Sequence, residues 1–330
     1  MHVYRDEDAD LALIRSRRVA VLGYGNQGRA QALNLRDSAV AVTVALPDAS
    51  GSRARAEADG FAVMTAADAC READLVVMLA ADELHGRIYR EELAPNLQEG
   101  ATLLFAHGLS IRFGLIEPRP DLDIVLVGPK GPGTALRREY ERGQGLIALF
   151  AVHQDPSGGA RATALSYAAA IGSGRAGILE TSFAEECEAD LFNEQAVLWG
   201  AIPELIHAGF ETLVDAGFSP EIAYFECLTE VKLLADLIHE RGIAGMREAI
   251  SNTAEFGALK GGTRIVTADT RTEMRRILRE VRGGGFVKEL IADAEAGYPR
   301  LKASREQSAA HPIETVAGRL RALAPPAADG

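Results

Sequence analysis

Near its N-terminus the chain reads Arg17-Arg18-Val19-Ala20-Val21-Leu22-Gly23-Tyr24-Gly25-Asn26-Gln27-Gly28, an apolar strand that runs directly into a glycine-rich turn. A helix is expected over Arg29–Leu35 and a second apolar strand over Val40–Leu46. In this context the first glycine allows a tight turn, the second lets a pyrophosphate approach the backbone, and the third packs helix on strand. The helix N-terminus then points at the anion. Residues 23–28 therefore predict a dinucleotide site.

The end of the second strand is expected to contact the adenosine ribose. The chain reads Leu46-Pro47-Asp48-Ala49-Ser50-Gly51-Ser52-Arg53 at this point. An acid about 20 residues past the glycines bonds the ribose 2′-hydroxyl of NAD and repels a 2′-phosphate, whereas a nearby arginine favours NADP. Asp48 therefore favours NADH, while Ser50, Ser52 and Arg53 leave a phosphate site open. The alternative is that Asp48 only begins a turn.

Strands and helices continue to alternate up to about residue 180. Further strands are expected at Asp74–Ala80, Thr102–Phe105, Ile124–Val127 and Leu146–Val152, and a further helix at Arg161–Ile171. Such alternation predicts an α/β fold with a doubly wound parallel sheet. Residues 1–181 are thus expected to form a Rossmann domain that binds NAD(P).

Two chemically useful side chains follow predicted strands at the points where those strands end. His107 lies in Ala106-His107-Gly108, and Lys130 lies in Gly128-Pro129-Lys130-Gly131-Pro132-Gly133. Ligands of open parallel sheets bind outside the carboxyl ends of the strands. Both side chains are therefore candidates for the nicotinamide end of the site, although a lone His or Lys on a loop is more often structural.

Beyond Thr181 the strand pattern gives way to helices. They are expected at Glu185–Ala208, Glu211–Ala216, Pro220–Glu240, Ile243–Ser251, Arg271–Arg282, Phe286–Ala296 and His311–Leu323, with a capping turn at Ser251–Gly257. Residues 182–330 are expected to form an all-α domain. The final segment, Ala324–Gly330, is expected to be a disordered tail.

Two of these helices carry carboxylates at i,i+4 spacing: Asp190 with Glu194, and Glu226 with Glu230. Like charges at this spacing destabilise a helix by roughly 0.2–0.5 kcal/mol in water, and by more where water is excluded. Because both pairs have apolar neighbours, the pattern favours a bound cation over the alternative, two solvated faces. Carboxylates without His or Cys suit Mg²⁺ or Mn²⁺ better than Zn²⁺.

The composition is that of a globular protein and argues against several partners. The chain has 330 residues, of which 47% are hydrophobic and 25% charged, and its net charge is −12. An acidic chain without a basic stripe argues against nucleic acid. Three widely spaced cysteines indicate neither a disulfide framework nor a zinc ribbon. With neither a signal peptide nor a membrane span visible, a cytoplasmic location is expected.

Several segments match a known family. They are Gly23–Gly28, Phe105–Gly108, Pro129–Gly133, Val152–Asp155, Asp190–Gln195, Ala223–Glu226 and Ile250–Glu255. Over essentially its whole length the chain resembles ketol-acid reductoisomerase of the short, class I type. The resemblance implies an enzyme of branched-chain amino-acid biosynthesis. Such an enzyme shifts an alkyl group of 2-acetolactate from C2 to C3 and reduces the new ketone with NADH or NADPH.

The same resemblance implies two Mg²⁺ ions per site and a homodimer, or a higher oligomer, whose knotted helical domains interlock. Asp190 is then expected to bridge both ions and Glu194 to bind one. Glu226 and Glu230 are expected to come from the partner subunit, with Glu230 also serving as acid or base. Lys130 is expected to tune a water on the metal through its charge.

The resemblance also implies which residues contact the organic ligands. Ser251, again from the partner subunit, is expected to hold the substrate carboxylate. Ala254 and Trp199 are expected to line the substrate. His107 and Pro132 are expected to flank the nicotinamide, and Gly133 is expected to contact the cofactor as well.

Several positions depart from the family pattern. They are Asn26 for Ser, Leu109-Ser110 for Phe-Asn, Thr134 for His, Leu146-Ile147 for Val-Pro, Trp199 for Cys and Thr229 for His. A tryptophan in place of a cysteine must shrink or reshape a pocket. One alternative is therefore a related reductase of another keto or imino acid in specialised metabolism. Another is a non-catalytic nucleotide-binding regulator, but such a protein has no use for the complete set of expected metal ligands.

Overall fold

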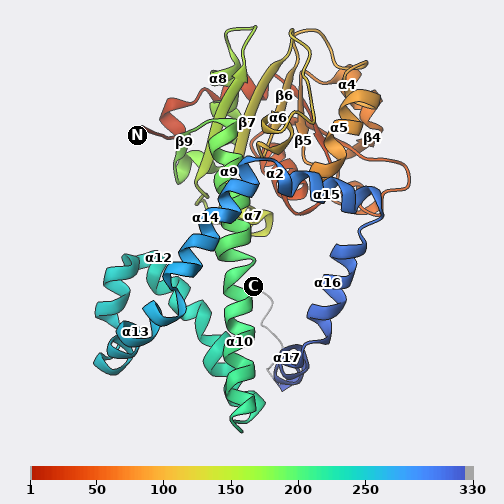
Figure 1. Cartoon of the computed structure of the whole chain (residues 1–330). Coiled ribbons are helices and arrows are strands. Elements are labelled where there is room, and N and C mark those ends of the chain that lie inside the picture. Colours follow the sequence, from red (N-terminus) through yellow and green to blue (C-terminus); the bar gives the residue numbers. More distant parts are fainter. Residues whose placement is uncertain (1, 324–330) are drawn as a thin grey trace. The chain divides into compact units, whose positions relative to one another are not determined.

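The computed structural model describes residues 2–323, so the predicted tail Ala324–Gly330 lies outside the described residues. The chain forms two compact units, of which the first ends at Ala189 and the second begins at Asp190. The sequence placed this boundary after residue 181. The first unit combines a sheet with helices, and the second is built from helices (Figure 1). The predicted fold class, a Rossmann sheet followed by a helical domain, is confirmed.

Within residues 2–323, nine strands form one sheet in the order β1-β9-β8-β7-β6-β5-β2-β3-β4. Their bounds are β1 Val3–Tyr4, β2 Arg18–Leu22, β3 Ala41–Ala45, β4 Ala62–Met64, β5 Leu75–Met78, β6 Thr102–Phe105, β7 Asp123–Pro129, β8 Ala148–Gln154 and β9 Ile178–Glu180. From β4 to β7 all neighbours are parallel. Their carboxyl ends therefore meet at one edge.

One side of the sheet differs from the predicted parallel arrangement. β8 runs antiparallel to β7, and β9 pairs parallel with β8. An apolar run such as Leu146–Val152 marks a buried strand but carries no sign of its direction. The short strands β1, β4 and β9 were not predicted, because segments of two or three residues are too short to show alternation.

Helices cover both faces of this sheet. Their bounds are α1 Leu11–Arg15, α2 Asn26–Asp37, α3 Arg53–Ala58, α4 Ala66–Glu72, α5 His85–Ile88, α6 Leu109–Arg112, α7 Gly133–Glu141 and α8 Ala160–Ala170, with single turns η1 Asp6–Asp8, η2 Asp82–Leu84, η3 Tyr89–Leu93 and η4 Ser173–Arg175. Along β2, Val19 and Val21 belong to one core cluster, and Ala20 and Leu22 belong to the other. Successive strand residues face opposite sides, so the continuous apolar run is explained by two buried faces.

In the second unit, as far as Leu323, the elements are helical. They are α9 Phe183–Asn193 (which begins in the first unit), η5 Glu194–Leu198, α10 Ala201–Asp215, α11 Pro220–Tyr224, η6 Phe225–Thr229, α12 Glu230–Ala249, α13 Asn252–Ile265, α14 Ala268–Arg282, α15 Gly285–Glu295, α16 Pro299–Ala310 and α17 Pro312–Leu323. The helices α13 and α16 were not predicted. The glycines at 257, 261 and 262 concealed α13, whose N-cap is Ser251, the residue predicted to begin a capping turn.

Both helices that carry the acidic pairs contain a turn of π-helix, which the sequence did not reveal. Residues Glu194–Leu198 and Phe225–Thr229 form these turns. After the first, the amides of Trp199 and Gly200 both donate to the Glu194 carbonyl, at 3.2 and 3.0 Å. The predicted helix Glu185–Ala208 is therefore interrupted. Such π-turns occur frequently at functional sites because they redirect side chains.

Candidate active site

In the glycine-rich turn, two glycines have no space for a side chain, and the third has open space beside its backbone. A Cβ on Gly23, whose φ is +98°, would lie 2.4 Å from the Leu79 carbonyl oxygen, and one on Gly28 would lie 2.2 Å from the Gly23 carbonyl oxygen. By contrast, no heavy atom lies within 4 Å of the Cβ position of Gly25. Space beside this backbone at the start of α2 is what a pyrophosphate requires.

The side chain of Tyr24 has a structural role. It is 1% exposed, and its hydroxyl donates to Asp59 at 2.8 Å. Burial, followed by the bond to Asp59, raises the pKa of Tyr24 far above its ordinary value. Contact between Tyr24 and a cofactor would therefore come from its backbone.

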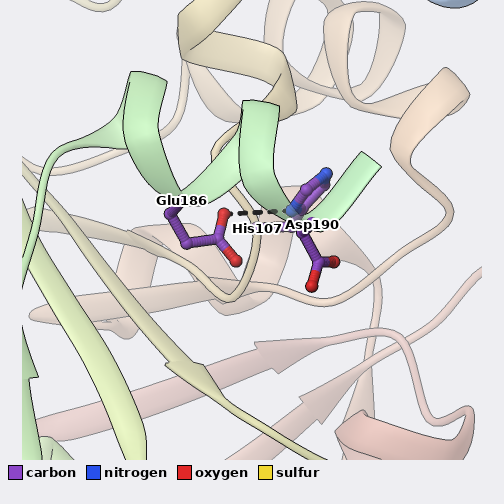
Figure 2. Close-up of side chains that lie close together, drawn as sticks. All are labelled: His107, Glu186 and Asp190. Atoms are coloured by element: carbon purple, nitrogen blue, oxygen red, sulfur yellow. Dashed lines mark hydrogen bonds and ion pairs between the residues drawn. The ribbon is translucent and has the colours of Figure 1, made fainter. Parts of the chain in front are cut away.

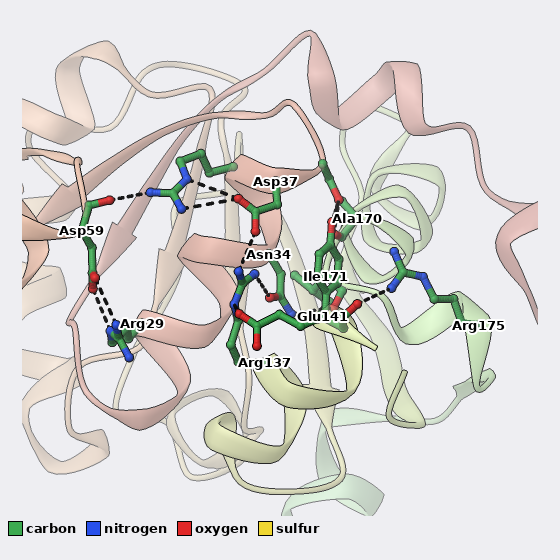
Figure 3. Close-up of polar contacts among 12 residues, drawn as sticks. Arg29, Asn34, Asp37, Asp59, Arg137, Glu141, Ala170, Ile171 and Arg175 are labelled. Atoms are coloured by element: carbon green, nitrogen blue, oxygen red, sulfur yellow. Dashed lines mark hydrogen bonds and ion pairs between the residues drawn. The ribbon is translucent and has the colours of Figure 1, made fainter. Parts of the chain in front are cut away.

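The outer side of α2 is fixed by ion pairs and hydrogen bonds to neighbouring elements (Figure 3). Arg29 pairs with Asp59 at 2.7 Å. Arg137 on α7 donates to Asn34 at 2.9 Å and pairs with Asp37 at 2.7 Å. The helix whose N-terminus faces the expected pyrophosphate is therefore held by the rest of the unit.

At the ribose end, Asp48 is exposed and Arg53 is engaged by two carboxylates. The Asp48 side chain is 86% exposed. Arg53 lies 3.5 Å from the Asp48 carboxylate and 3.7 Å from that of Glu57, and it donates to the carbonyls of Leu46 and Val63. Ser50 Oγ accepts from the amide of Ser52 at 3.3 Å, which closes a local turn. A 2′-phosphate would have to compete with two carboxylates for Arg53.

The loop that carries Lys130 is fastened to the glycine-rich turn. Gln27 donates to the Gly131 carbonyl at 2.8 Å, and the amide of Thr134 donates to Asn26 Oδ1 at 3.1 Å. Asn26 and Thr134 are two of the departures from the family pattern, and they bond to each other. Pro132 is the N-cap of α7, so the N-termini of α2 and α7 lie together at this edge of the sheet.

Glu186 on α9 joins the two candidate residues at the ends of β6 and β7. Its side chain is 1% exposed. One carboxylate oxygen accepts from His107 Nδ1 at 3.0 Å and from the Gly108 amide at 2.9 Å, and the other accepts from Lys130 Nζ at 2.8 Å. Figure 2 shows Glu186 and His107 bonded, with Asp190 beside them.

The charges of this group follow from its contacts. Burial would raise the pKa of Glu186, but hydrogen bonds and attraction from His107 and Lys130 lower it to about 2. Burial likewise opposes protonation of His107, whereas its contacts with Cys187 and Glu186 raise its pKa well above the ordinary value. One buried carboxylate therefore holds two cationic side chains.

His107, Glu186 and Asp190 each offer a potential ligand atom, and these atoms lie within 4.8 Å of one another. Both oxygens of Glu186 already accept hydrogen bonds, so we do not regard Glu186 as a metal ligand. Asp190 follows Glu186 by about one turn of the same helix, α9. This helix continues across the boundary between the two units. Its carboxylate suits Mg²⁺, and it lies beside the Glu186 group.

Sequence reasoning missed Glu186 and also His85. His85 is 2% exposed. Its Nε2–H donates to the Ala80 carbonyl at 3.0 Å, and Nδ1 accepts from Ser110 at 2.8 Å, so the departure Ser110 has a defined partner. Burial lowers the pKa of His85, which favours the neutral ring. Glu186 could have been found, since it precedes Asp190 by the same four residues that separate Asp190 from Glu194.

The remaining predicted ligands of metal and substrate lie in the second unit. Glu194 is half-buried at the start of η5, whereas Glu226 in η6 and Glu230 at the start of α12 are exposed. Ser251 accepts from the Ala254 amide at 3.2 Å. In the chain from residue 2 to 323, the acidic pair 226/230 is not part of a three-ligand cluster with Asp190.

Large apolar side chains of the second unit are also exposed. Trp199 is 68% exposed, Leu233 61%, Phe256 62% and Leu259 69%. Monomeric proteins rarely leave large contiguous apolar patches in water. Trp199 therefore does not belong to the buried core of the single chain.

Comparison with known families and structures identifies the chain's relatives. Residues 13–177 match the family model "Acetohydroxy acid isomeroreductase, NADPH-binding domain", and residues 183–326 match "Ketol-acid reductoisomerase, C-terminal domain". A solved NADH-preferring ketol-acid reductoisomerase from an uncultured archean is 42% identical, with a TM-score of 0.96. The match covers 98% of this chain and 99% of that one.

More distant structures share only the fold. A semialdehyde dehydrogenase NAD-binding protein from Cupriavidus necator is 19% identical with a TM-score of 0.58, over 81% of this chain and 98% of that one. A pyrroline-5-carboxylate reductase from Coxiella burnetii is 15% identical with a TM-score of 0.52, over 81% of this chain and 96% of that one. With two family models spanning its length and a relative at 42% identity, the chain belongs to the ketol-acid reductoisomerase family.

Proposed function

We propose that this protein is a Mg²⁺-requiring, NAD(P)H-dependent ketol-acid reductoisomerase of branched-chain amino-acid biosynthesis. It rearranges 2-acetolactate-type acids and reduces them to 2,3-dihydroxy acids. The observation that carries the proposal is the buried Glu186 group, which holds His107 and Lys130 next to Asp190. A residue proposed to contact the nicotinamide, His107, thus lies next to a proposed metal ligand, Asp190. An enzyme that both rearranges and reduces one substrate requires this proximity.

The donor set fits the expected metal. Asp190, Glu194, Glu226 and Glu230 offer only carboxylate oxygens, which Mg²⁺ prefers. Alkyl migration needs loss of the C2 hydroxyl proton together with polarisation of the C3 ketone. When bound, two Mg²⁺ ions supply the Lewis acidity for both. Glu230, exposed in the single chain, would accept or return the proton.

Glu186 holds two cationic side chains, His107 and Lys130, at fixed positions. Lys130 and protonated His107 carry one positive charge more than Glu186 neutralises, and the Asp190 carboxylate beside them would offset this charge unless it binds Mg²⁺ as proposed above. This charge favours an anionic substrate and the negative charge that develops on its oxygens. Since Glu186 stays ionised at neutral pH, both donors keep their orientation throughout the reaction.

We infer that NADH serves at least as well as NADPH. Residues 23–28 would hold the pyrophosphate, and Asp48 would bond the ribose hydroxyls. A 2′-phosphate would meet the exposed Asp48 and an Arg53 that is engaged by two carboxylates. The repulsion is screened at an exposed site, so the preference is modest. The 42%-identical relative is described as NADH-preferring, which supports the same direction.

We further propose a homodimer with shared active sites. Glu226, Glu230 and Ser251 of the partner subunit would complete the site that begins with Asp190 and Glu194. The exposed apolar side chains of α10 to α13 support this arrangement, because a second copy would cover them. Within the described part of the chain, no helix is both long and apolar enough to cross a membrane. We propose that the enzyme acts in the cytoplasm.

The proposed function is tested with a substrate panel. Purified protein should oxidise NADH with 2-acetolactate and 2-aceto-2-hydroxybutyrate, only when Mg²⁺ is present, and should yield the 2,3-dihydroxy acids. Hydroxypyruvate-type keto acids and cyclic imines serve as comparison substrates. Higher kcat/KM with a cyclic imine than with 2-acetolactate, or turnover unaffected by EDTA, would contradict the proposal.

A further inference from the structure

A chain of three hydrogen-bonded side chains, two of them buried, connects the core of the first unit to the loop that carries Lys130. The Tyr167 hydroxyl donates to Gln31 Oε1 at 2.6 Å, and Gln31 Nε2 donates to Gln27 Oε1 at 3.1 Å. Gln27 Nε2 then donates to the Gly131 carbonyl at 2.8 Å. The function proposed above gives Gln31 and Tyr167 no role.

The burial of these groups makes their orientation unique. Tyr167 and Gln31 are both 0% exposed, so their polar atoms depend on one another for hydrogen bonds. Each amide accepts from one neighbour and donates to the next, so all the bonds point toward Gly131. Burial raises the pKa of Tyr167, which keeps its hydroxyl protonated as the first donor. Loss of that donor leaves the buried Oε1 of Gln31 without its hydrogen bond, which weakens the hold of Gln31 on Gln27.

The end of the chain lies between two residues with expected roles in the reaction. Gly131 separates Lys130 from Pro132. The Lys130 amide donates to the Ile147 carbonyl at 2.8 Å, and the Thr134 amide bonds to Asn26, so Gln27 supplies a further attachment between these two. The segment from Lys130 to Thr134 is thereby held at its start, at Gly131 and at its end.

We propose that Tyr167, Gln31 and the side chain of Gln27 are positioning residues for this loop. Through the Gly131 carbonyl they set the places of the Lys130 ammonium and the Pro132 ring. The inference rests on the proposed function for the roles of Lys130 and Pro132.

The test compares two tyrosines that each lose one hydroxyl. Tyr167→Phe removes the first donor of the chain, and Tyr140→Phe removes the hydroxyl that lies 2.7 Å from Ser38 Oγ. With saturating 2-acetolactate and Mg²⁺, Tyr167→Phe should lower kcat/KM for NADH about tenfold, because small misplacements of reacting groups are costly. The Tyr140→Phe variant should stay close to wild type. Equal losses in both variants would overturn the proposal.

A double-mutant cycle separates positioning from general stability. Gln27→Met cuts the same chain at its other end, so Tyr167→Phe should lower kcat/KM little further in that background. Losses that simply multiply would mean that Tyr167 does not act through Gln27. If wild-type protein fails to turn over 2-acetolactate, the proposed function fails separately. The cycle is then run on the Kd of NADH from fluorescence titration, where the same non-additivity is expected and additive losses would contradict the chain.

Discussion

The functional side chains at the cofactor end of the first unit and those on the acidic helices of the second unit differ in their exposure to solvent. In the first unit, Glu186 has a side chain that is 1% exposed, and both its oxygens accept hydrogen bonds. In the second, Glu226 and Glu230 are exposed, and Phe256 is 62% exposed. In the first unit, the buried functional side chains find their hydrogen-bond partners within one chain. In the second unit, acidic and apolar side chains are exposed, as they would be on a surface that binds a second copy.

The cores of the two units differ in the same sense. Two large clusters fill both faces of the sheet. A core of the second unit is built from the buried residues Phe210, Ala223, Ile313 and Val316. The exposed apolar side chains of this unit would contribute to stability once a second copy covers them. The contrast therefore predicts which substitutions act within one chain and which act between chains.

The largest effect is expected at Asp190, the first residue of the second unit. Asp190→Asn removes a carboxylate from the proposed metal site, so several kcal/mol of charge stabilisation and about 10³-fold or more of kcat should be lost. Mg²⁺-dependent NADH oxidation with 2-acetolactate measures the change. Asp215→Asn, an exposed acid at the end of α10, is the matched control. Turnover by Asp190→Asn near the wild-type rate would show that the metal site is elsewhere.

Glu186→Gln should have the next largest effect, because it leaves two cationic side chains without their buried partner. Removing one member of a buried ion pair typically costs about 3–5 kcal/mol. We expect kcat to fall by about 10²-fold as His107 and Lys130 lose their orientation. In an NMR titration, the pKa of His107 should fall toward its ordinary value. An unchanged His107 pKa would contradict the assigned charges.

The pH dependence of stability gives a second reading of Glu186. A carboxyl with a lowered folded-state pKa stabilises the fold above its ordinary pKa, and this contribution disappears as pH falls toward about 2. His107, whose pKa is raised, contributes fully below its ordinary pKa and loses this contribution as pH rises through the raised value. The wild type should therefore exceed Glu186→Gln in unfolding free energy most between about pH 4.5 and 6.5. Urea titrations at several pH values measure this difference, and a pH-independent difference would argue against the ion pairs.

A smaller effect is expected at the exposed ribose end. Asp48→Ser removes the charge that repels a 2′-phosphate and frees Arg53, so kcat/KM should shift toward NADPH by several-fold, within the roughly 1 kcal/mol of an exposed charge interaction. The ratio of kcat/KM for the two cofactors is the measurement. A strong preference for NADPH in wild type, unchanged by Asp48→Ser, would show that Asp48 does not read the cofactor.

The smallest effect on overall activity is expected at Trp199. Trp199→Cys opens volume beside the proposed substrate, so kcat/KM for 2-aceto-2-hydroxybutyrate should rise relative to 2-acetolactate, within the roughly 1–3 kcal/mol of overpacking. Because the indole is 68% exposed in the single chain, it adds little to the core of its own unit. A large drop in Tm with an unchanged substrate ratio would place Trp199 in a packing role instead.

Sequence reasoning served the first unit better because its signals are local. The glycine spacing in residues 23–28 and the apolar runs of β2, β5 and β6 depend on neighbouring residues only, so their prediction was sound. The reversed direction of β8 arises from pairing across the sheet. The Glu186 group likewise joins residues about 56 to 79 positions apart, as its bonds to Lys130 and His107 show, and no short motif encodes such a meeting.

In the second unit, sequence reasoning found helices but not their interruptions. The π-turns η5 and η6 contain no residue type that would distinguish them from ordinary helix in the sequence. The glycines of α13 led to the prediction of a turn there instead of a helix. The i,i+4 argument for a cation assumed that both acidic pairs are desolvated. In the single chain Glu226 and Glu230 are exposed, so this argument requires a second subunit.

The shared site is the central claim, and mixed dimers test it most directly. Glu194→Gln and Glu226→Gln chains, carrying different tags and co-expressed, are purified as a verified heterodimer and assayed with 2-acetolactate, NADH and Mg²⁺. Each homodimer should be nearly inactive. In the heterodimer one of the two sites would combine the intact Glu194 with the intact Glu226, so activity should return to about half that of wild type. A verified heterodimer as inactive as its two parents would contradict a site shared between subunits.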